Sequence, residues 1–294
     1  MSQDPAQMYL HSLSMGTDMI QNMLSTVAAK LGKVFLAVDG GSGPGSYLPH
    51  LLTLLAPGGK LISLDPSQEM LDAVANRFNP AKLKQVQLVQ AKIEEMHHFA
   101  KDADIVLCAS SLQFTDVSLA VDAVYETLAD HGVFLFSMPM GLAGALQESP
   151  QGVYQRFQEL FHANLRAAVA KEAASFPQED VARPRKDRNL LQFLNPCLDR
   201  GFEVIGSPSD PLVFKALQTV PASKLATHLS VPWRAERFVP GLEHRIQELC
   251  IRRAIEKTIT EMKLDKHFPF PRTVSYVALK KSLAGARPSE AVRH

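Results

Sequence analysis

A glycine-rich turn between an apolar strand and an apolar-periodic helix is the feature that most constrains the fold of this chain. Residues 34–38 (VFLAV) suit a buried parallel strand. Residues 39–46 (DGGSGPGS) break this pattern, and residues 47–55 (YLPHLLTLL) restart it with the spacing of a helix. Because glycine has no Cβ and adopts positive φ easily, a ligand can lie against bare backbone at such a turn. The stretch predicts the front half of a β-α-β unit with a ligand site at the turn.

The spacing of the glycines separates two classes of ligand. The dinucleotide fingerprint G-x-G-x-x-G needs a third glycine. Counted from Gly41, that position is Ser46, and the extra glycine, Gly45, comes one residue early. Asp39 lies at the end of the strand, where a carboxylate would repel a diphosphate and attract an ammonium group. The pattern favours a ligand with a cationic amino-acid head, and a nicotinamide-dependent oxidoreductase is the alternative.

Residues 39–45 resemble the acid-x-G-x-G-x-G first motif of class I S-adenosylmethionine-dependent methyltransferases that act on small molecules. In that family the turn holds the methionyl part of the cofactor, and the cofactor amine lies near the acid. The resemblance implies an α/β fold: a doubly wound, Rossmann-like sheet of seven mostly parallel strands, the last one antiparallel, with helical cap insertions. It assigns the first cofactor contacts to Asp39, Gly40, Gly41, Ser42, Gly43 and Gly45.

A second acid follows the second predicted strand. Residues 60–65 (KLISLD) come after a breaker cluster at residues 56–59 (APGG) and end in Asp65. An acid about 20 positions beyond the glycine turn can accept hydrogen bonds from both ribose hydroxyls. Asp65 also opens a good helix start, where either it or Ser67 could be the N-cap.

The same segment extends the family resemblance. Residues 65–74 resemble the D-x-S-x-x-M-L-x-x-A pattern of small-molecule methyltransferases, in which the methionine lies beside the adenine; Val74 stands in the final alanine position. The resemblance adds Asp65, Pro66 and Met70 to the cofactor contacts.

The third and fourth predicted strands, residues 86–89 (VQLV) and 103–110 (ADIVLCAS), complete the predicted cofactor site. Many relatives place an adenine-binding aspartate after the third strand, but this chain has Lys92 there, so we expect the backbone N–H of Ile93 to meet the ring instead. Ligands of open parallel sheets lie beyond the carboxyl ends of the strands. Ala109 and Ser110 are therefore expected to line the cleft.

The acceptor side is indicated by residues 111–116 (SLQFTD), which resemble the S-L-Q-W-x-x-D stretch of carboxylate-methylating members, including the trans-aconitate and malonyl-carrier-protein enzymes. Phe114 replaces the tryptophan, and the acid comes one residue early. The resemblance implies substrate contacts at Gln113 and Phe114 and a carboxylate as one class of acceptor. Tyr9 and His11, in a segment with helical spacing, are further candidates as lid residues, unless they pack on the surface.

The predicted function is methyl transfer from S-adenosylmethionine to a small-molecule acceptor. The leaving group is neutral, so the protein mainly aligns the reactants and removes water. A carboxylate acceptor is already ionised and needs no general base, whereas an amine or phenol would usually need one. No catalytic residue is predicted; His11, His162 and His228 are candidate bases only because their segments could reach the cleft. Besides the oxidoreductase, a cofactor-binding protein that does not methylate, such as a scaffold or cyclase, is an alternative.

Composition excludes several other classes. The 294-residue chain has a formal net charge of +1, so it lacks the strongly basic charge balance that is typical of nucleic-acid-binding proteins. The sequence has no stretch of about 20 predominantly apolar residues, so we expect no segment that spans a membrane. The N-terminus lacks a secretory pattern, and the three scattered cysteines show no metal-ligand spacing. We therefore expect a cytoplasmic protein without a bound metal, and the sequence indicates nothing about its oligomeric state.

Alternation of strands and helices predicts how the chain is divided. The resemblance covers residues 33–139 and thins beyond them. The predicted parts are an N-terminal helical lid (1–32), the cofactor-binding core (33–139), a first helical insertion (140–188), a core continuation (189–208), a second, mostly helical insertion (209–271), a final core strand (272–282) and a tail (283–294).

Overall fold

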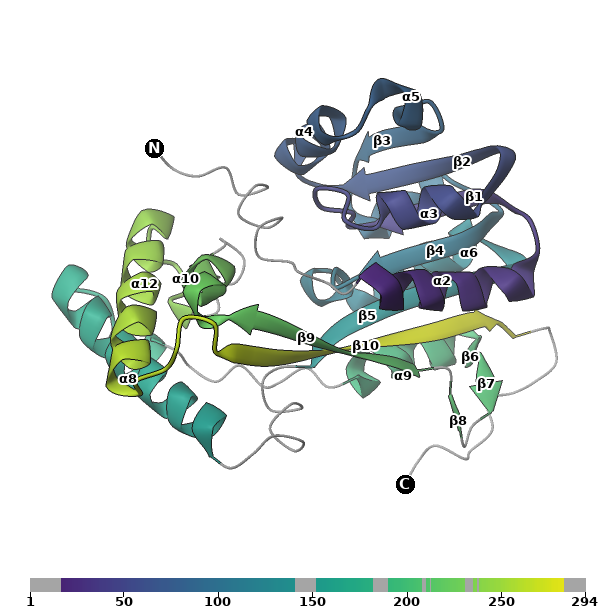
Figure 1. Cartoon of the computed structure of the whole chain (residues 1–294). Coiled ribbons are helices and arrows are strands. Elements are labelled where there is room, and N and C mark those ends of the chain that lie inside the picture. The colour runs from purple at the N-terminus through teal and green to yellow at the C-terminus, as the bar shows by residue number, and fades with distance from the viewer. Residues whose placement is uncertain are drawn as a thin grey trace. The chain divides into compact units, whose positions relative to one another are not determined.

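The computed structural model of the chain divides into two compact units (Figure 1). One comprises Gly16–Pro139, Arg188–Ala216 and Val274–His294, and the other comprises Met1–Met15, Met140–Asp187 and Leu217–Thr273. The structure describes residues 17–140, 152–181, 190–207, 210–211, 213–230, 235–236 and 238–282. Tyr9, His11 and the predicted tail lie outside the described residues. The boundaries of the parts predicted from the sequence stay a prediction.

The first unit is built on one large sheet, in which the described strands follow the order β3-β2-β1-β4-β5-β10-β6, with β9 paired to β10. The neighbours β1–β2, β1–β4, β2–β3 and β4–β5 are parallel, and β10 is antiparallel to β6. The predicted Rossmann-like sheet with an antiparallel last strand is therefore confirmed. The strands are β1 (Val34–Gly40), β2 (Leu55–Asp65), β3 (Val86–Gln90), β4 (Ala103–Ala109), β5 (Leu128–Met140), β6 (Phe202–Val204), β9 (Val213–Pro221) and β10 (Pro269–Lys281).

The strand order reverses at β1, and this reversal places the site. From β1 the chain passes through α3 (Leu48–Leu54) to β2 and through α4 (Gln68–Arg77) to β3 on one side. It then returns to β4 on the other side of β1. In open α/β sheets, ligands bind beyond the carboxyl ends of the two strands at such a switch point. The glycine turn begins where β1 ends, at this position.

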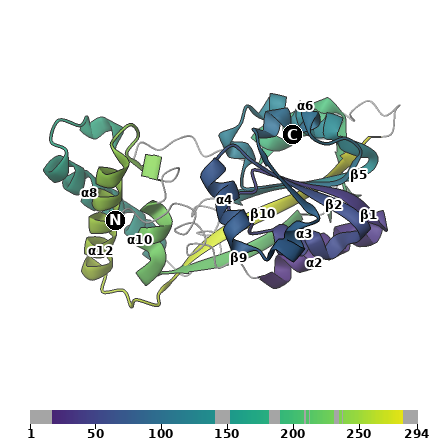
Figure 2. The same ribbon diagram turned by 90° about the horizontal axis from the view of Figure 1, so that it is seen from above.

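Helices cover both faces of the sheet, with α6 (Val117–Thr127) on one face and α2 (Thr17–Leu31) and α3 on the other (Figure 2). Alternation along β1 divides its side chains between the two layers. Val38 belongs to the apolar cluster that also holds side chains of α6, the 3-10 helix η1 (Ile93–His98) and α9 (Leu191–Arg200). Asp39, the next residue, points to the opposite layer.

The breaker cluster predicted at residues 56–59 is an insertion inside strand β2, and residues 129–132 form a similar insertion inside β5. The pairing of β1 with β2 jumps from Val34↔Leu55 to Leu36↔Lys60. The pairing of β4 with β5 likewise jumps from Ala103↔Leu128 to Ile105↔Val133. Strand β2 therefore begins earlier than the strand that the sequence predicts at residues 60–65. In addition, β9 is a strand inside the segment predicted to be mostly helical, and β7 (Gly206–Ser207) pairs with β8 (Asp210–Pro211) in a separate small sheet.

The second unit contains the helices α8 (Val153–Glu172), α10 (Ala222–Ser230) and α12 (His244–Glu261) around their own apolar cluster. Polar contacts join two of these helices: the Asn164 side chain on α8 donates to Thr258 Oγ1 at 3.1 Å and to Glu261 Oε2 at 3.0 Å, both on α12. The 3-10 turn η3 (Gln178–Asp180) also belongs to this unit, whereas the short helix α5 (Pro80–Leu83) belongs to the first unit. Among the described residues, no helix has both the length and the apolar character needed to cross a bilayer.

Asp104 holds the amino ends of β1 and β4 together. Its buried carboxylate accepts hydrogen bonds from the backbone N–H of Phe35 at 2.7 Å and of Leu36 at 3.0 Å through Oδ2. Its Oδ1 lies 2.9 Å from His131 Nε2. The two amides belong to the point where the β1–β2 pairing shifts register, so the carboxylate supplies partners that the sheet ladder does not.

We expect Asp104→Ala to lower the free energy of unfolding by about 2–4 kcal/mol, because it leaves two backbone donors without their acceptor. Asp104→Asn keeps one acceptor oxygen, so its free energy of unfolding should fall by less. Chemical denaturation measures both. The exposed Asp130, 3.6 Å from Lys281, is the matched control, and Asp130→Ala should change stability by less than about 0.5 kcal/mol. Equal losses in the Asp104 and Asp130 variants would contradict the assignment.

Candidate functional site

The glycine turn is held on the end of β2. The carbonyl oxygen of Leu64 accepts hydrogen bonds from Gly41 N at 2.8 Å and Ser42 N at 3.0 Å. Asp65 Oδ2 accepts from Gly43 N at 2.8 Å, and Ser63 Oγ donates to Ser42 Oγ at 2.8 Å. The turn is therefore fixed by the neighbouring strand as well as by its own sequence.

Two of the turn glycines are required by close packing as well as by backbone conformation. Gly41 has φ +70°, and a Cβ there would lie 2.4 Å from Ser111 Cβ. Gly45 has φ +75°, and a Cβ there would lie 3.0 Å from Val74 Cγ2 and 3.1 Å from Phe78 Cε2. Larger residues would both strain the backbone and push away the loop after β4 or the end of α4.

Asp39 is a buried carboxyl without a partner. Its side chain is 0% exposed, and neither carboxyl oxygen has a hydrogen-bond partner among the described residues. In the sheet it lies opposite Ser63 of β2 and Leu107 of β4. Burial, with a contribution from the nearby negative charge of Asp65, raises the pKa of Asp39 to about 8. An orphaned buried acid at the tip of the first strand is the most unusual electrostatic feature of this site.

Asp65 differs from Asp39 because both of its oxygens are used. Oδ2 accepts from Gly43 N, and Oδ1 accepts from Ser67 N at 2.9 Å. Burial raises the pKa of Asp65, and the two amide donors act against this rise. The N-cap of α4 is Ser67, whose Oγ accepts from Met70 N, so Asp65 joins the turn to the helix start without being the cap itself. A carboxylate has about four lone-pair sites, so two remain for other donors.

The remaining predicted cofactor residues lie around this turn. Met70 is 7% exposed on α4, and Ile93 is 4% exposed at the start of η1. The Ile93 side chain packs beneath the turn, with Cδ1 3.4 Å from the position of a Cβ on Gly41. The carbonyl oxygen of Pro66 accepts from Gln90 Nε2 at 3.3 Å. Lys92, which is not among the predicted cofactor contacts, is exposed.

Ser110, directly after β4, holds a strained backbone conformation. Its φ is +55°, a region that costs a non-glycine residue about 1–2 kcal/mol. It is held there by its N–H, which donates to Ser137 O at 3.1 Å, and by its carbonyl, which accepts from Gln113 Nε2 at 2.6 Å. The hydroxyls of Ser110 and Ser137 are 3.3 Å apart. Strained residues cluster at functional sites, and this one lies at the switch-point edge of the sheet.

The predicted substrate residues Gln113 and Phe114 belong to the 3-10 turn η2 (Leu112–Phe114), next to Ser110. Phe114 is 55% exposed. Tyr9 and His11 lie outside the described residues. Of the candidate bases, His162 is in α8, where burial and the charge of Arg166 lower its pKa; the side chain of His228 is not described.

Sequence reasoning missed the residues that support the turn from a distance. Tyr47, directly after the turn, shares a 3.0 Å hydroxyl–hydroxyl hydrogen bond with Tyr276 of β10, and both side chains are buried. Arg77, in the last turn of α4, donates from Nη1 to the carbonyl oxygen of Pro44 at 3.3 Å. The position of Tyr47 beside the glycines was the only local signal, because the other two residues lie far away in the sequence.

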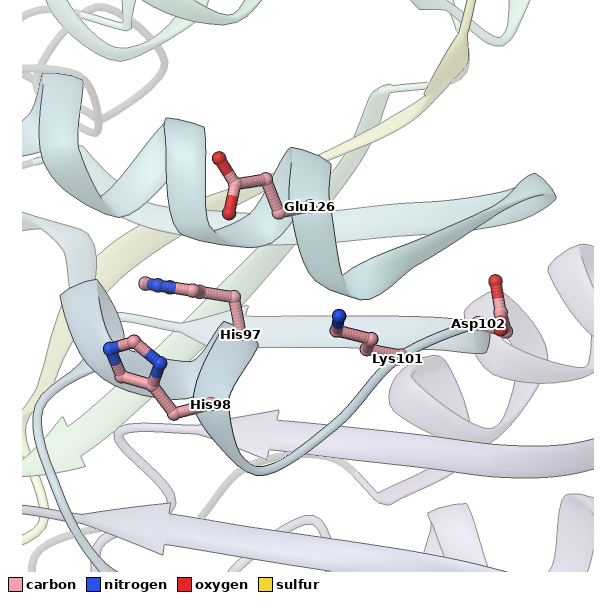
Figure 3. Close-up of a pocket in the computed structure, with 5 residues that line it drawn as sticks. All are labelled: His97, His98, Lys101, Asp102 and Glu126. Atoms are coloured by element: carbon pink, nitrogen blue, oxygen red, sulfur yellow. The ribbon is translucent and has the colours of Figure 1, made fainter.

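A surface pocket lies elsewhere on the same unit and does not belong to this site. It is lined by His97 and His98 of η1, Lys101, Asp102 and, on α6, Glu126 (Figure 3). Asp102 directly precedes β4, so the pocket is at the amino edge of the sheet, opposite the glycine turn. Figure 3 shows the five side chains spread along the pocket without converging on one point. No group of three potential metal ligands exists among the described residues.

We expect Gly41→Ala to lower the free energy of unfolding by at least about 2 kcal/mol, since a strained φ adds to a clash with Ser111. Gly58→Ala is the matched control: Gly58 has φ +83°, but a Cβ there would meet nothing within 4 Å. The free energy of unfolding of Gly58→Ala should fall by only about 1 kcal/mol, because only the backbone strain remains. Denaturant titration of both variants measures the difference, and equal losses would show that the contact with Ser111 is unimportant.

Asp39→Asn should stabilise the protein at neutral and alkaline pH. The pKa of Asp39 is raised from an ordinary value of 3.8, so the folded state binds more protons than the unfolded chain between pH 3.8 and about 8. Wild-type stability therefore falls as the pH rises through this window, whereas the amide cannot ionise. We expect the variant to be more stable by at least about 2 kcal/mol at pH 7, since each pKa unit corresponds to about 1.4 kcal/mol. Thermal unfolding of both proteins from pH 4 to pH 8 measures the gap, which should close toward pH 4; a constant gap would contradict the argument.

Comparison with known proteins agrees with this geometry. Residues 38–136 match the family model of a methyltransferase domain. No curated protein matches this chain in sequence. The structure is similar to that of a protein from Bacillus halodurans assigned as a methyltransferase, with 16% identity and a TM-score of 0.52 over 91% of this chain and 100% of the other.

Two further solved structures are similar at a lower level. One is assigned as a type II methyltransferase from Anaeromyxobacter dehalogenans, with 12% identity and a TM-score of 0.49 over 89% of this chain and 95% of the other. The other is assigned as a sarcosine dimethylglycine methyltransferase from Galdieria sulphuraria, with 12% identity and a TM-score of 0.49 over 89% and 85%. The family-model match over residues 38–136, the strand order and the acid–glycine turn together confirm the predicted resemblance to class I, S-adenosylmethionine-dependent methyltransferases.

Proposed function

We propose that this chain transfers the methyl group of S-adenosylmethionine to a small-molecule acceptor, and that the acceptor atom is a carboxylate oxygen. The observation that carries the first part is the buried carboxyl of Asp39, whose two oxygens have no partner among the described residues. A ligand with an ammonium group supplies the missing charge and donors. A dinucleotide diphosphate offers this carboxyl neither a cation nor a hydrogen-bond donor.

The residues present fit the cofactor along its whole length. Asp39 would receive the ammonium group, and the backbone of the turn would hold the methionyl part. The unused lone pairs of Asp65 suit the two ribose hydroxyls. The apolar side chains of Met70 and Ile93 would contact the adenine, with Pro66 beside them. Ala109 and Ser110 end β4 at the same edge of the sheet.

When bound, the cofactor supplies an electrophilic methyl group whose departure leaves a neutral thioether. The residues of this chain therefore need to orient the acceptor and exclude water, with little charge to stabilise. Gln113 and Phe114 are the proposed acceptor contacts: η2 fixes them beside Ser110, and the hydrogen bond from Gln113 to the Ser110 carbonyl keeps this loop in its strained form.

A carboxylate acceptor suits the chemistry of this edge. Between Ala109 and Thr115 the described residues after β4 are serine, leucine, glutamine, phenylalanine and threonine, with no ionisable side chain. An ionised carboxylate needs no base for attack on a methyl group, whereas an amine must lose a proton. The composition of this loop therefore favours the carboxylate that the SLQF stretch indicates.

Binding of S-adenosylhomocysteine by calorimetry tests the cofactor. We expect a one-site isotherm, and Asp65→Ala should weaken it at least about tenfold because the ribose loses its acceptors and the turn loses its contact at Gly43. The affinity of Asp65→Asn for S-adenosylhomocysteine should lie between those of the wild type and Asp65→Ala. Asp122→Ala, which removes an exposed carboxylate on α6 paired with Arg200, is the control and should bind as the wild type does. Absence of binding to the wild type would refute the proposed function; enhancement of NADH fluorescence would point to the oxidoreductase alternative.

Transfer of labelled methyl groups tests the acceptor class. The protein is incubated with methyl-labelled cofactor and with matched small molecules that carry a carboxylate, an amine or a phenol. We expect label only in the carboxylate series, and alkaline hydrolysis should release it as volatile methanol, which N-methyl and aryl methyl ether products do not yield. Label in an alkali-stable product would contradict the carboxylate, and binding without any transfer would favour a protein that holds the cofactor without methylating.

A further inference from the structure

The proposed function leaves the protonation state of Asp39 in the free protein to be explained. The side chain is fully buried, and no donor among the described residues reaches either oxygen. An ionised carboxylate in such a place is strongly unfavourable, and the usual response of a buried acid is to keep its proton. Asp65 beside it is different, because two backbone N–H groups favour its ionised form.

The elements packed against β1 offer Asp39 no compensating cation. These elements are β2, β4 and α3. Lys60 pairs with Leu36, three positions before Asp39, and Asp104 contacts the amino end of β1, so both lie toward the opposite edge of the sheet. Burial raises the pKa of the Cys108 thiol and lowers the pKa of His50, so both are neutral near pH 7. The titratable groups on these three elements are Lys60, Asp65, Asp104, Cys108 and His50.

We propose that Asp39 is protonated in the free protein and gives up this proton when the ammonium group of the cofactor arrives, so that each binding event releases one proton to solvent. The O–H bond of the carboxyl breaks, the proton passes to the buffer, and the carboxylate left behind pairs with the ammonium group. This inference rests on the proposed function, because it requires a ligand with that head group.

The exchange gives the site a selectivity that a permanently ionised acid would not have. A neutral carboxyl attracts no small cations or polyamines from solution, and it does not repel the carboxylate of the ligand's amino-acid head. Only a ligand whose ammonium group is delivered to the turn by its other contacts can displace the proton. The raised pKa of Asp39, about 8, agrees with this order of events.

Calorimetric titration with S-adenosylhomocysteine in phosphate and Bis-Tris buffers at pH 6.5 tests the proposal. These buffers differ in ionisation enthalpy, so the dependence of the observed heat on the buffer gives the number of protons released. We expect close to one proton per ligand. The dissociation constant should also fall about tenfold from pH 6 to pH 7, as linkage to one proton requires.

Two matched comparisons identify the source of the proton. Asp39→Asn, which cannot ionise, should bind without proton release and with a dissociation constant that does not change between pH 6 and pH 7; Asp65→Asn and the exposed control Asp122→Asn should still release it. 5′-Methylthioadenosine, which keeps the ribose and adenine but has no amino-acid head, should bind wild-type protein without release.

The outcomes separate this inference from the function on which it rests. Binding of S-adenosylhomocysteine without proton release, or release that Asp65→Asn abolishes and Asp39→Asn keeps, would overturn the inference and leave the methyltransferase proposal standing. No binding of S-adenosylhomocysteine by the wild type would overturn both. If Asp39→Asn does not fold, the wild-type titration and the comparison with 5′-methylthioadenosine still decide the matter.

Discussion

The hydrogen bonds from two backbone amides to Asp65 are the interaction on which the rest of this site depends. One amide, at Gly43, belongs to the glycine turn, and the other, at Ser67, belongs to the start of α4. One carboxylate thus fixes the position of the turn after β1 relative to the helix after β2. Because the Leu64 carbonyl accepts two more hydrogen bonds from the turn, the loop is held at both halves by adjacent residues of one strand.

Unlike Asp65, whose hydrogen bonds stabilise the site, Asp39 lowers the stability of the folded protein. A buried acid without partners destabilises the folded state at neutral pH, and an asparagine of the same size would remove this penalty. Nothing in the packing of β1 requires a carboxyl at this position. Natural proteins keep such unfavourable groups where a ligand uses them. The same reasoning applies to Ser110, whose left-handed conformation is held by hydrogen bonds to Ser137 and Gln113.

Those parts of the fold that depend on local patterns were predictable from the sequence. The strand, the turn and Asp65 lie within 32 residues of each other, and each has a local signal in glycine spacing, apolar runs or an acid at a strand end. The strand at Val213–Pro221 was missed because its apolar residues fit a helix as well as a strand, and pairing with β10 decides between them. Tyr47 and Tyr276, 229 residues apart, could not be paired because nothing local links them.

The division of charge within the site explains why its two halves differ in how far they can be predicted. Both acids, Asp39 and Asp65, lie under the turn, where under the proposed function the cofactor would bring a cationic head and hydroxyl donors of fixed chemistry. Residues 110–115 after β4 are all uncharged, which suits the proposed reaction because its departing thioether is neutral and an ionised acceptor needs no proton removed. A fixed ligand requires particular residue types at particular positions, and these form a motif. An acceptor that needs alignment alone can be held by many combinations of serine, amide and aromatic side chains, so its identity is set by shape and leaves little trace in the order of residues.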